Sequence, residues 1–189
     1  MIYIQLLESM ALIAISAYIY NQSHVLKNMI KGELKFIDKV ALIAFFGILG
    51  IIGNYTGVNV EPYAMNSIKP MGSIQAGYIG LHDAIANTRP IAAIVGGYIG
   101  GPIFGIIIGI IAGTHRYFLG GFTALSCGVA TLAEGFIGGL IKKYSKDEDF
   151  NLKHVFIGAV SAECCQMIII LLLSRPFSAA LKLVDIIAV

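Results

Sequence analysis

The stretch that decides the fold runs from Asn87 to Glu134 and reads NTRPIAAIVGGYIGGPIFGIIIGIIAGTHRYFLGGFTALSCGVATLAE. It is apolar and rich in glycine, which recurs at every fourth position from 97 to 113. Such a row gives a helix a smooth face that another backbone can approach closely. Arg89 and Arg116 lie inside or at the rim of this apolar sequence. Because a charged side chain at membrane depth costs about 2.5–3.5 kcal/mol, each arginine needs a partner there.

The composition of the rest of the chain indicates a membrane protein. Of the 189 residues, 57% are hydrophobic and 13% are charged, and the mean hydropathy is +0.82. A soluble domain carries about 25% charged residues. The net charge of +2 indicates neither nucleic-acid binding nor a polybasic membrane-surface protein. We therefore expect an all-α helical bundle, surrounded by membrane lipid and crossing the bilayer several times.

Apolar segments separated by polar or glycine–proline breaks predict about six short spans in a single domain, 1–189. The expected spans cover residues 3–20, 40–55, 90–99, 103–116, 122–141 and 155–173. Residues 59–86 are polar and broken by proline and glycine, so we expect irregular structure there, with a short helix over 79–86. The chain stops within the apolar sequence VDIIAV. We read this end as that of a module of a longer protein, cut before a further span and whatever follows it.

Positive charge is concentrated in two loops, and this predicts the orientation. Residues 27–39 and 142–153 each hold four lysines, eight of the 13 Lys and Arg. An even number of spans separates the loops, so the positive-inside rule places both in the cytoplasm and the N-terminus outside. Both arginines then lie in the outer half of the bundle. Residues 21–39 fit either an amphipathic interfacial helix or a solvated basic loop.

The two arginines point to a small anionic ligand. A guanidinium group is a planar fork of donors matched to carboxylate or phosphate, and a helix that begins near Arg89 adds free backbone N–H groups. Cys127, Thr131 and Glu134 follow at i, i+4 and i+7 on one helical face. The candidate ligand-binding residues are therefore Asn87, Thr88, Arg89, Arg116, Cys127 and Thr131.

A structural explanation of the same charges stands beside this one. Glu134 or Glu163 is a candidate charge partner of either arginine, since charges in membranes commonly pair with one another. Two deep carboxylates against two arginines leave the site neutral, so ligand binding requires one of them to point elsewhere or be protonated.

No cofactor or catalytic motif is expected in this chain. His82 has no second histidine at metal-ligand spacing, and the three cysteines lie in apolar segments rather than in a disulfide framework. There is also no phosphoacceptor-histidine motif and no ATP-binding motif in the sequence. We therefore predict no metal, no cofactor and no enzymatic activity of this chain alone.

The sequence resembles the transmembrane sensor region of LytS/YhcK-type histidine kinases, the five-transmembrane LytS receptor family. The resemblance rests on N-T-R at Asn87–Arg89, on GGYIGGPIFGIIIGIIAGTHRYFLGGFTALSCG, on L-x-E-G at Leu132–Gly135, and on FFGILGIIGNYTG in the second span. It implies a homodimeric receptor in a bacterial plasma membrane. It also implies a two-component system, with a cytoplasmic kinase module, a LytTR-class response regulator, and control of autolysis or carboxylate-uptake genes.

In that family the ligand is a small extracellular carboxylate such as pyruvate. Carried over by motif position, Arg89, Arg116 and Cys127 match the residues associated with it. The family's hydroxyl side chain after the cysteine is replaced by Ala130, with Thr131 next to it, and Pro90 also departs from the pattern. Two other functions remain open: a substrate-binding subunit similar to those of energy-coupling-factor transporters, and a structural dimerisation bundle.

Overall fold

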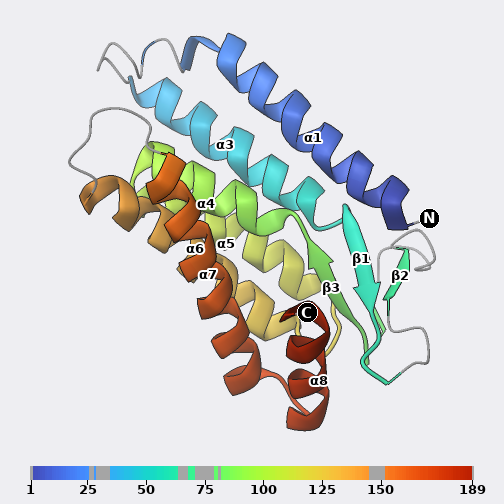
Figure 1. Cartoon of the computed structure of the whole chain (residues 1–189). Coiled ribbons are helices and arrows are strands. Elements are labelled where there is room, and N and C mark those ends of the chain that lie inside the picture. The colour runs from blue at the N-terminus through green and yellow to red at the C-terminus, as the bar shows by residue number, and fades with distance from the viewer. Residues whose placement is uncertain are drawn as a thin grey trace.

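The computed structural model describes residues 2–25, 28, 35–63, 68–70, 79–80, 82–144 and 152–188. Helices predominate, and a small sheet lies at one end of the bundle (Figure 1). The helices are α1 (Ile2–Gln22), α3 (Phe36–Gly53), α4 (Arg89–Gly100), α5 (Pro102–Phe118), α6 (Ala124–Tyr144), α7 (Leu152–Leu173) and α8 (Phe177–Ala188). The strands are β1 (Gly57–Val60), β2 (Ile68–Pro70) and β3 (Ala84–Asn87).

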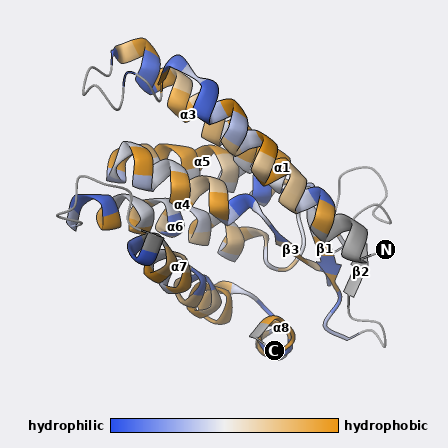
Figure 2. Ribbon diagram, turned by 45° about the horizontal axis from the view of Figure 1, so that its top comes forward, coloured by the Kyte–Doolittle hydropathy of each residue, from blue (hydrophilic) through white to orange (hydrophobic). Residues whose placement is uncertain are grey.

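The length and composition of the helices agree with a multi-pass membrane protein. Three helical segments are long and apolar enough to cross a bilayer, Phe36–Gly53, Ala124–Tyr144 and Phe156–Leu173, and Pro102–Phe118 is a shorter apolar helix. Hydrophobic residues run along all of these helices (Figure 2). Large apolar side chains such as Ile103, Phe118 and Leu172 are exposed, as lipid-facing residues are. The mostly helical prediction is confirmed, whereas the number of six spans stays a prediction.

Glycine explains why α4, α5 and α6 pack so closely. A Cβ atom on Gly97 or Gly105 would overlap the carbonyl oxygen of Gly135, and one on Gly113 would lie 2.6 Å from the carbonyl oxygen of Gly128. Gly101, with φ 98°, separates α4 from α5, and Pro102 begins the next helix. The glycine at every fourth position therefore serves the packing of α4, α5 and α6 against one another.

The sheet corrects the prediction of an all-α fold. Its strand order is β2-β1-β3, and both pairings are antiparallel. Strand β3 occupies Ala84–Asn87, so the short helix expected over residues 79–86 is wrong. Each strand has only three or four residues, too few for a period-2 pattern to be read from the sequence. Gly57 pairs with Asn87, and this pairing fixes the start of α4 against the segment that follows α3.

The C-terminal helix closes the end of the bundle that carries the sheet. After α7 the chain turns at Ser174–Pro176, and α8 then lies beside β3 (Figure 1). One buried apolar cluster joins the sheet to α6, α7 and α8; its members are Val60, Ala84, Cys127, Ile170, Ala180 and Leu183. Residues 26, 27 and 29–34 of the predicted interfacial segment 21–39, and residues 145–151 of the basic loop 142–153, lie outside the described residues.

Candidate functional site

Both arginines of the decisive stretch are buried at the end of the bundle that carries the sheet. Arg89 is the first residue of α4 and Arg116 lies in the last turn of α5, with 1% and 0% of their surfaces exposed. Their charges are close enough to interact with each other. The α4–α5 hairpin thus brings together two cations that are 27 positions apart in the chain.

Arg116 holds the turn between α5 and α6. Its guanidinium donates to the Gly120 carbonyl oxygen at 2.6 Å and to the Thr123 hydroxyl at 3.1 Å, and the Cys127 side chain lies beside it. Gly120 has φ 82°, a conformation that side-chain-bearing residues rarely adopt. The Nε atom of Arg116 is buried and has no hydrogen-bond partner among the described residues. Arg116 therefore fixes the turn and keeps an unpaired donor at Nε.

Arg89 is bound more loosely, through Asn54. Its guanidinium donates to Asn54 Oδ1 at 3.4 Å, its backbone N–H donates to Asn87 Oδ1 at 3.3 Å, and its Nε is buried without a partner. Asn54 is itself fully buried, and its amide group donates to the Ala112 carbonyl oxygen at 3.3 Å. The same amide lies 3.0 Å from His115 Nδ1. Asn54 therefore fixes the position of Arg89 relative to α5.

Sequence reasoning missed Asn54 and Thr123. Asn54 follows the last turn of α3, and a polar residue directly after a long apolar span was the available signal. Thr123 precedes α6 in the glycine turn 120–123, and nothing in the sequence separates it from an ordinary turn residue. Each became a partner of an arginine only through the packing of α5.

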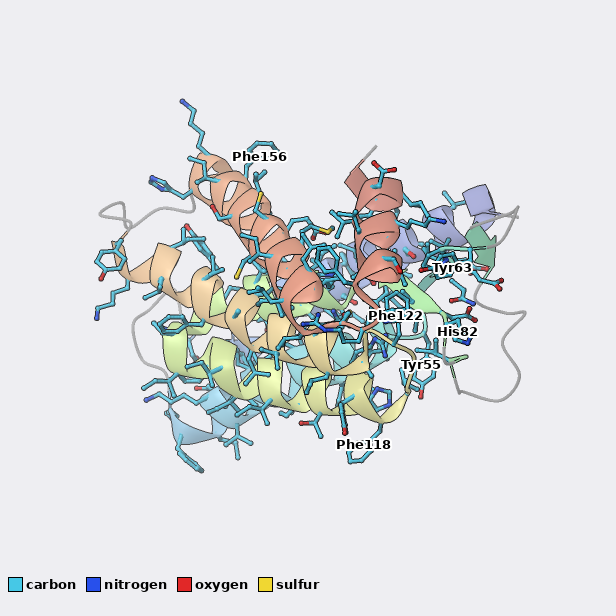
Figure 3. All side chains as sticks on the ribbon, turned by 90° about the horizontal axis from the view of Figure 1, so that it is seen from below. Tyr55, Tyr63, His82, Phe118, Phe122 and Phe156 are labelled. Atoms are coloured by element: carbon cyan, nitrogen blue, oxygen red, sulfur yellow. The ribbon has the colours of Figure 1, made fainter. Side chains whose placement is uncertain are left out.

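A small cavity of about 70 Å³ lies beside the arginines. Strand β3, α6, α7 and α8 supply its walls, whose polar members are Asn87, Thr123, Cys127, Glu163 and Gln166. Neither arginine lines it; Arg116 reaches the wall through its bond to Thr123. One water needs about 10–15 Å³ in this measure, so the volume suits several waters or a ligand of a few heavy atoms. Phe122 lies at this end of the molecule, beside α8 (Figure 3).

Two of the predicted ligand-binding residues point to other partners. The Thr131 hydroxyl donates to the Cys127 carbonyl oxygen at 2.7 Å, a bond to the preceding turn that threonine commonly makes inside a helix. The Thr88 hydroxyl lies 2.8 Å from that of Thr56. Neither side chain lines the cavity, whereas Asn87 and Cys127 both do.

The two candidate charge partners differ in their surroundings. Glu134 is 1% exposed, and neither of its carboxylate oxygens has a hydrogen-bond partner among the described residues. Its charge interacts with those of Arg89 and Glu163. Glu163 is exposed on α7, and it also lines the cavity. Glu134 therefore interacts with Arg89 through its charge and without a hydrogen bond among the described residues, and which carboxylate is the charge partner of which arginine stays a prediction.

No metal-binding cluster occurs among the residues that the structure describes. His82 is exposed at the edge of the molecule, near Tyr63 in the view of Figure 3. Cys127, Cys164 and Cys165 are all free.

The chain has well-defined relatives among curated proteins. It is 32% identical to the sensor histidine kinase BtsS of Escherichia coli K12 over 190 residues, which cover 97% of this chain and 30% of BtsS. It is 35% identical to the sensor protein LytS of Bacillus subtilis 168 over 195 residues, covering 98% of this chain and 31% of LytS. LytS of Staphylococcus epidermidis is 36% identical, covering 99% and 31%.

The chain thus spans about 30% of the length of these relatives. No solved structure matches it, so the expected likeness to energy-coupling-factor components stays a prediction. The family described as "5TMR of 5TMR-LYT" matches residues 23–189. The predicted resemblance to LytS-type sensors is confirmed, and the chain belongs to the 5TMR of 5TMR-LYT family.

Proposed function

We propose that this chain is the ligand-sensing membrane module of a LytS-type histidine kinase and that it binds a small extracellular carboxylate of about the size of pyruvate. The observation that carries the proposal is the pair of buried arginines, each with an unpartnered Nε donor, beside a cavity with polar walls. A buried charge is costly unless it is paired and hydrogen-bonded. An anion bound in this cavity would lie next to both cations, and Thr123 links it to Arg116.

The residues around Arg116 offer a route by which a carboxylate reaches it. Thr123 bonds the guanidinium, Cys127 lies beside it, and both line the cavity. A carboxylate in the cavity accepts a hydrogen bond from the Thr123 hydroxyl, and it competes with Thr123 for the guanidinium donors. A carboxylate is an ionised acceptor that can take two parallel bonds from a guanidinium, whereas the Thr123 hydroxyl is neutral and takes one, so the exchange favours the ligand. Asn87, at the end of β3, presents a further amide to the same cavity.

Signalling requires that the ligand bind two conformations with different affinity. Helices α7 and α8 both line the cavity, so they are the elements that we expect to move. In the full-length protein, as we propose, this movement regulates a cytoplasmic kinase module in a homodimer. A LytTR-class response regulator would then control autolysis or carboxylate-uptake genes. We also propose that the N-terminus and the cavity face the cell exterior, while residues 27–39 and 142–153 face the cytoplasm.

Titration of purified chain with pyruvate and L-lactate tests the binding proposal. We expect the affinity for both ligands to fall at least tenfold in Arg89→Ala and in Arg116→Lys, which keeps the charge and loses the fork. Arg175→Ala is the matched control, because Arg175 is an exposed arginine that bonds only the adjacent Ser174 carbonyl oxygen in this structure. Equal affinities in all four proteins, or no binding to any of them, would make the buried arginines structural.

A further inference from the structure

The wall of the cavity on α7 presents hydrogen-bond acceptors. Glu163 and Gln166 are three residues apart, so they share one side of the helix, and both line the cavity. Gln166 is 9% exposed, and its Oε1 atom is buried with no hydrogen-bond partner. A buried acceptor without a partner costs free energy that a donor on a ligand would recover. The α7 wall therefore favours a ligand that carries a hydrogen-bond donor.

The wall at the start of α6 presents donors. Thr123 and Cys127 line the cavity there, and Thr123 is bonded to the Arg116 guanidinium. The two walls thus differ in character: a cation and its hydroxyl neighbour on the α6 wall, a carboxylate and an amide oxygen on the α7 wall. A ligand that fits both needs an anionic end and a donating end separated by only a few bonds, because the cavity is about 70 Å³.

The balance of charge points the same way. The charge of Glu163 interacts with those of Arg89 and Glu134, so the site combines two arginines with two glutamates. A simple carboxylate gains from the arginines and is repelled by Glu163. A 2-keto group adds a second mismatch, since its oxygen brings lone pairs towards the lone pairs of Gln166 Oε1. A hydroxyl or an ammonium group at the same carbon donates instead.

We propose that Glu163 and Gln166 accept a hydrogen bond from a donor on the carbon next to the ligand's carboxylate. The cavity then prefers small 2-amino and 2-hydroxy carboxylates to 2-keto carboxylates. This inference rests on the proposed function and narrows its ligand class. The 2-amino acid is the better of the two preferred ligands, because its ammonium group also neutralises Glu163.

Three ligands that differ only at the second carbon test this: L-alanine, L-lactate and pyruvate. Each is titrated by calorimetry into the purified chain in detergent micelles. For the wild type we expect L-alanine and L-lactate to bind at least tenfold more tightly than pyruvate. Glu163→Gln should reduce the affinity for L-alanine to that for L-lactate. Gln166→Leu should bring the affinities for L-lactate and pyruvate within about twofold of each other.

Cys164→Ala is the matched control on α7, since Cys164 is exposed and does not line the cavity; it should leave all three affinities unchanged. Pyruvate binding as tightly as L-alanine and L-lactate in the wild type would overturn the inference, whatever the variants do. The inference would also be overturned if the ratios of the three affinities were the same in Glu163→Gln and Gln166→Leu as in the wild type. Failure of the proposed function looks different: none of the three ligands would bind, or binding would not respond to Arg89→Ala.

Discussion

The helices that carry the arginines and the helices that close the cavity are packed in different ways. On α4, α5 and α6, glycines bring backbone against backbone, as at Gly105 and Gly135. On α7 the corresponding glycine, Gly158, faces only the end of the Ile141 side chain, and α8 is buried through apolar side chains such as Leu183. Backbone contacts have no rotamers with which to adjust, whereas side chains do. The arginine side is therefore fixed, and the α7–α8 side can adapt.

The largest effect should come from a single methyl group in the glycine seam. In Gly135→Ala the new Cβ overlaps the Gly105 carbonyl oxygen, so the backbones of α5 and α6 must separate. We expect a loss of about 3 kcal/mol of stability, the upper end for overpacking, visible as a lower unfolding temperature in detergent. Gly158→Ala, with only a flexible side chain in the way, should be nearly neutral. Equal losses in both variants would remove the contrast between the two regions.

Truncating Leu183 tests the adaptable side. This side chain is 1% exposed and belongs to both the cavity wall and the apolar cluster. Leu183→Ala should cost about 2 kcal/mol, at the low end for a buried leucine because α8 can settle towards the gap. If α8 keeps its place instead, the cavity grows, and 2-hydroxybutyrate should then bind as tightly as lactate. Thermal unfolding and a ligand series with one added carbon measure the two outcomes.

Asn54 offers a test of the fixed side in which the side chain keeps its shape and loses its donor to the Ala112 carbonyl oxygen. Asn54→Asp has nearly the same shape and places a carboxylate within reach of the Arg89 guanidinium. This internal anion competes with the ligand, so we expect affinity for small carboxylates to fall roughly tenfold, the equivalent of one charge-assisted hydrogen bond. Asn28→Asp, a change at a residue bonded to Asp38 and far from Arg89 in the chain, is the control. Unchanged affinity in Asn54→Asp would show that Arg89 takes no part in binding.

The smallest expected effect has the opposite sign. Glu134→Gln removes a buried carboxylate whose oxygens have no hydrogen-bond partner and whose charge offsets Arg89. The site becomes more positive, and a monocarboxylate should bind about threefold more tightly, a small gain because the removed charge is already offset by Arg89. Glu8→Gln, at an exposed position of α1, should change nothing. Weaker binding in Glu134→Gln would mean that the carboxylate orders Arg89.

The sequence predicted those features of the fold that depend on residues within a single helix. The Gly-Gly-Pro break at Gly100–Pro102, the start of α4 at Arg89 and the long span 155–173 follow from local rules for glycine, proline and apolar length. The burial of both arginines also follows, because they stand inside apolar sequence. These features need no knowledge of what lies opposite them.

The rest depended on partners distant in the chain. Strand β3 forms because Ala84–Asn87 pairs with β1. Neither segment is long enough to be predicted as a strand from its own sequence. Asn54 gained its role from Arg89, and Thr123 from Arg116. The α7 wall was foreseen only in part: Glu163 was recognised as a charge, and Gln166 was not recognised. Pairwise contacts of this kind are decided by tertiary packing, which a periodic pattern does not encode.

The shortness of α4 has a consequence for the surrounding lipid. With 12 residues it is about 18 Å long, against a hydrocarbon core of ~30 Å. We propose that α4 is one of the spans, and a span this short would be met by local thinning of the bilayer, at a fraction of a kcal/mol per Å. Acyl-chain length would then act on the helix that begins with Arg89, and reconstitution in thin and thick bilayers should give measurably different ligand responses.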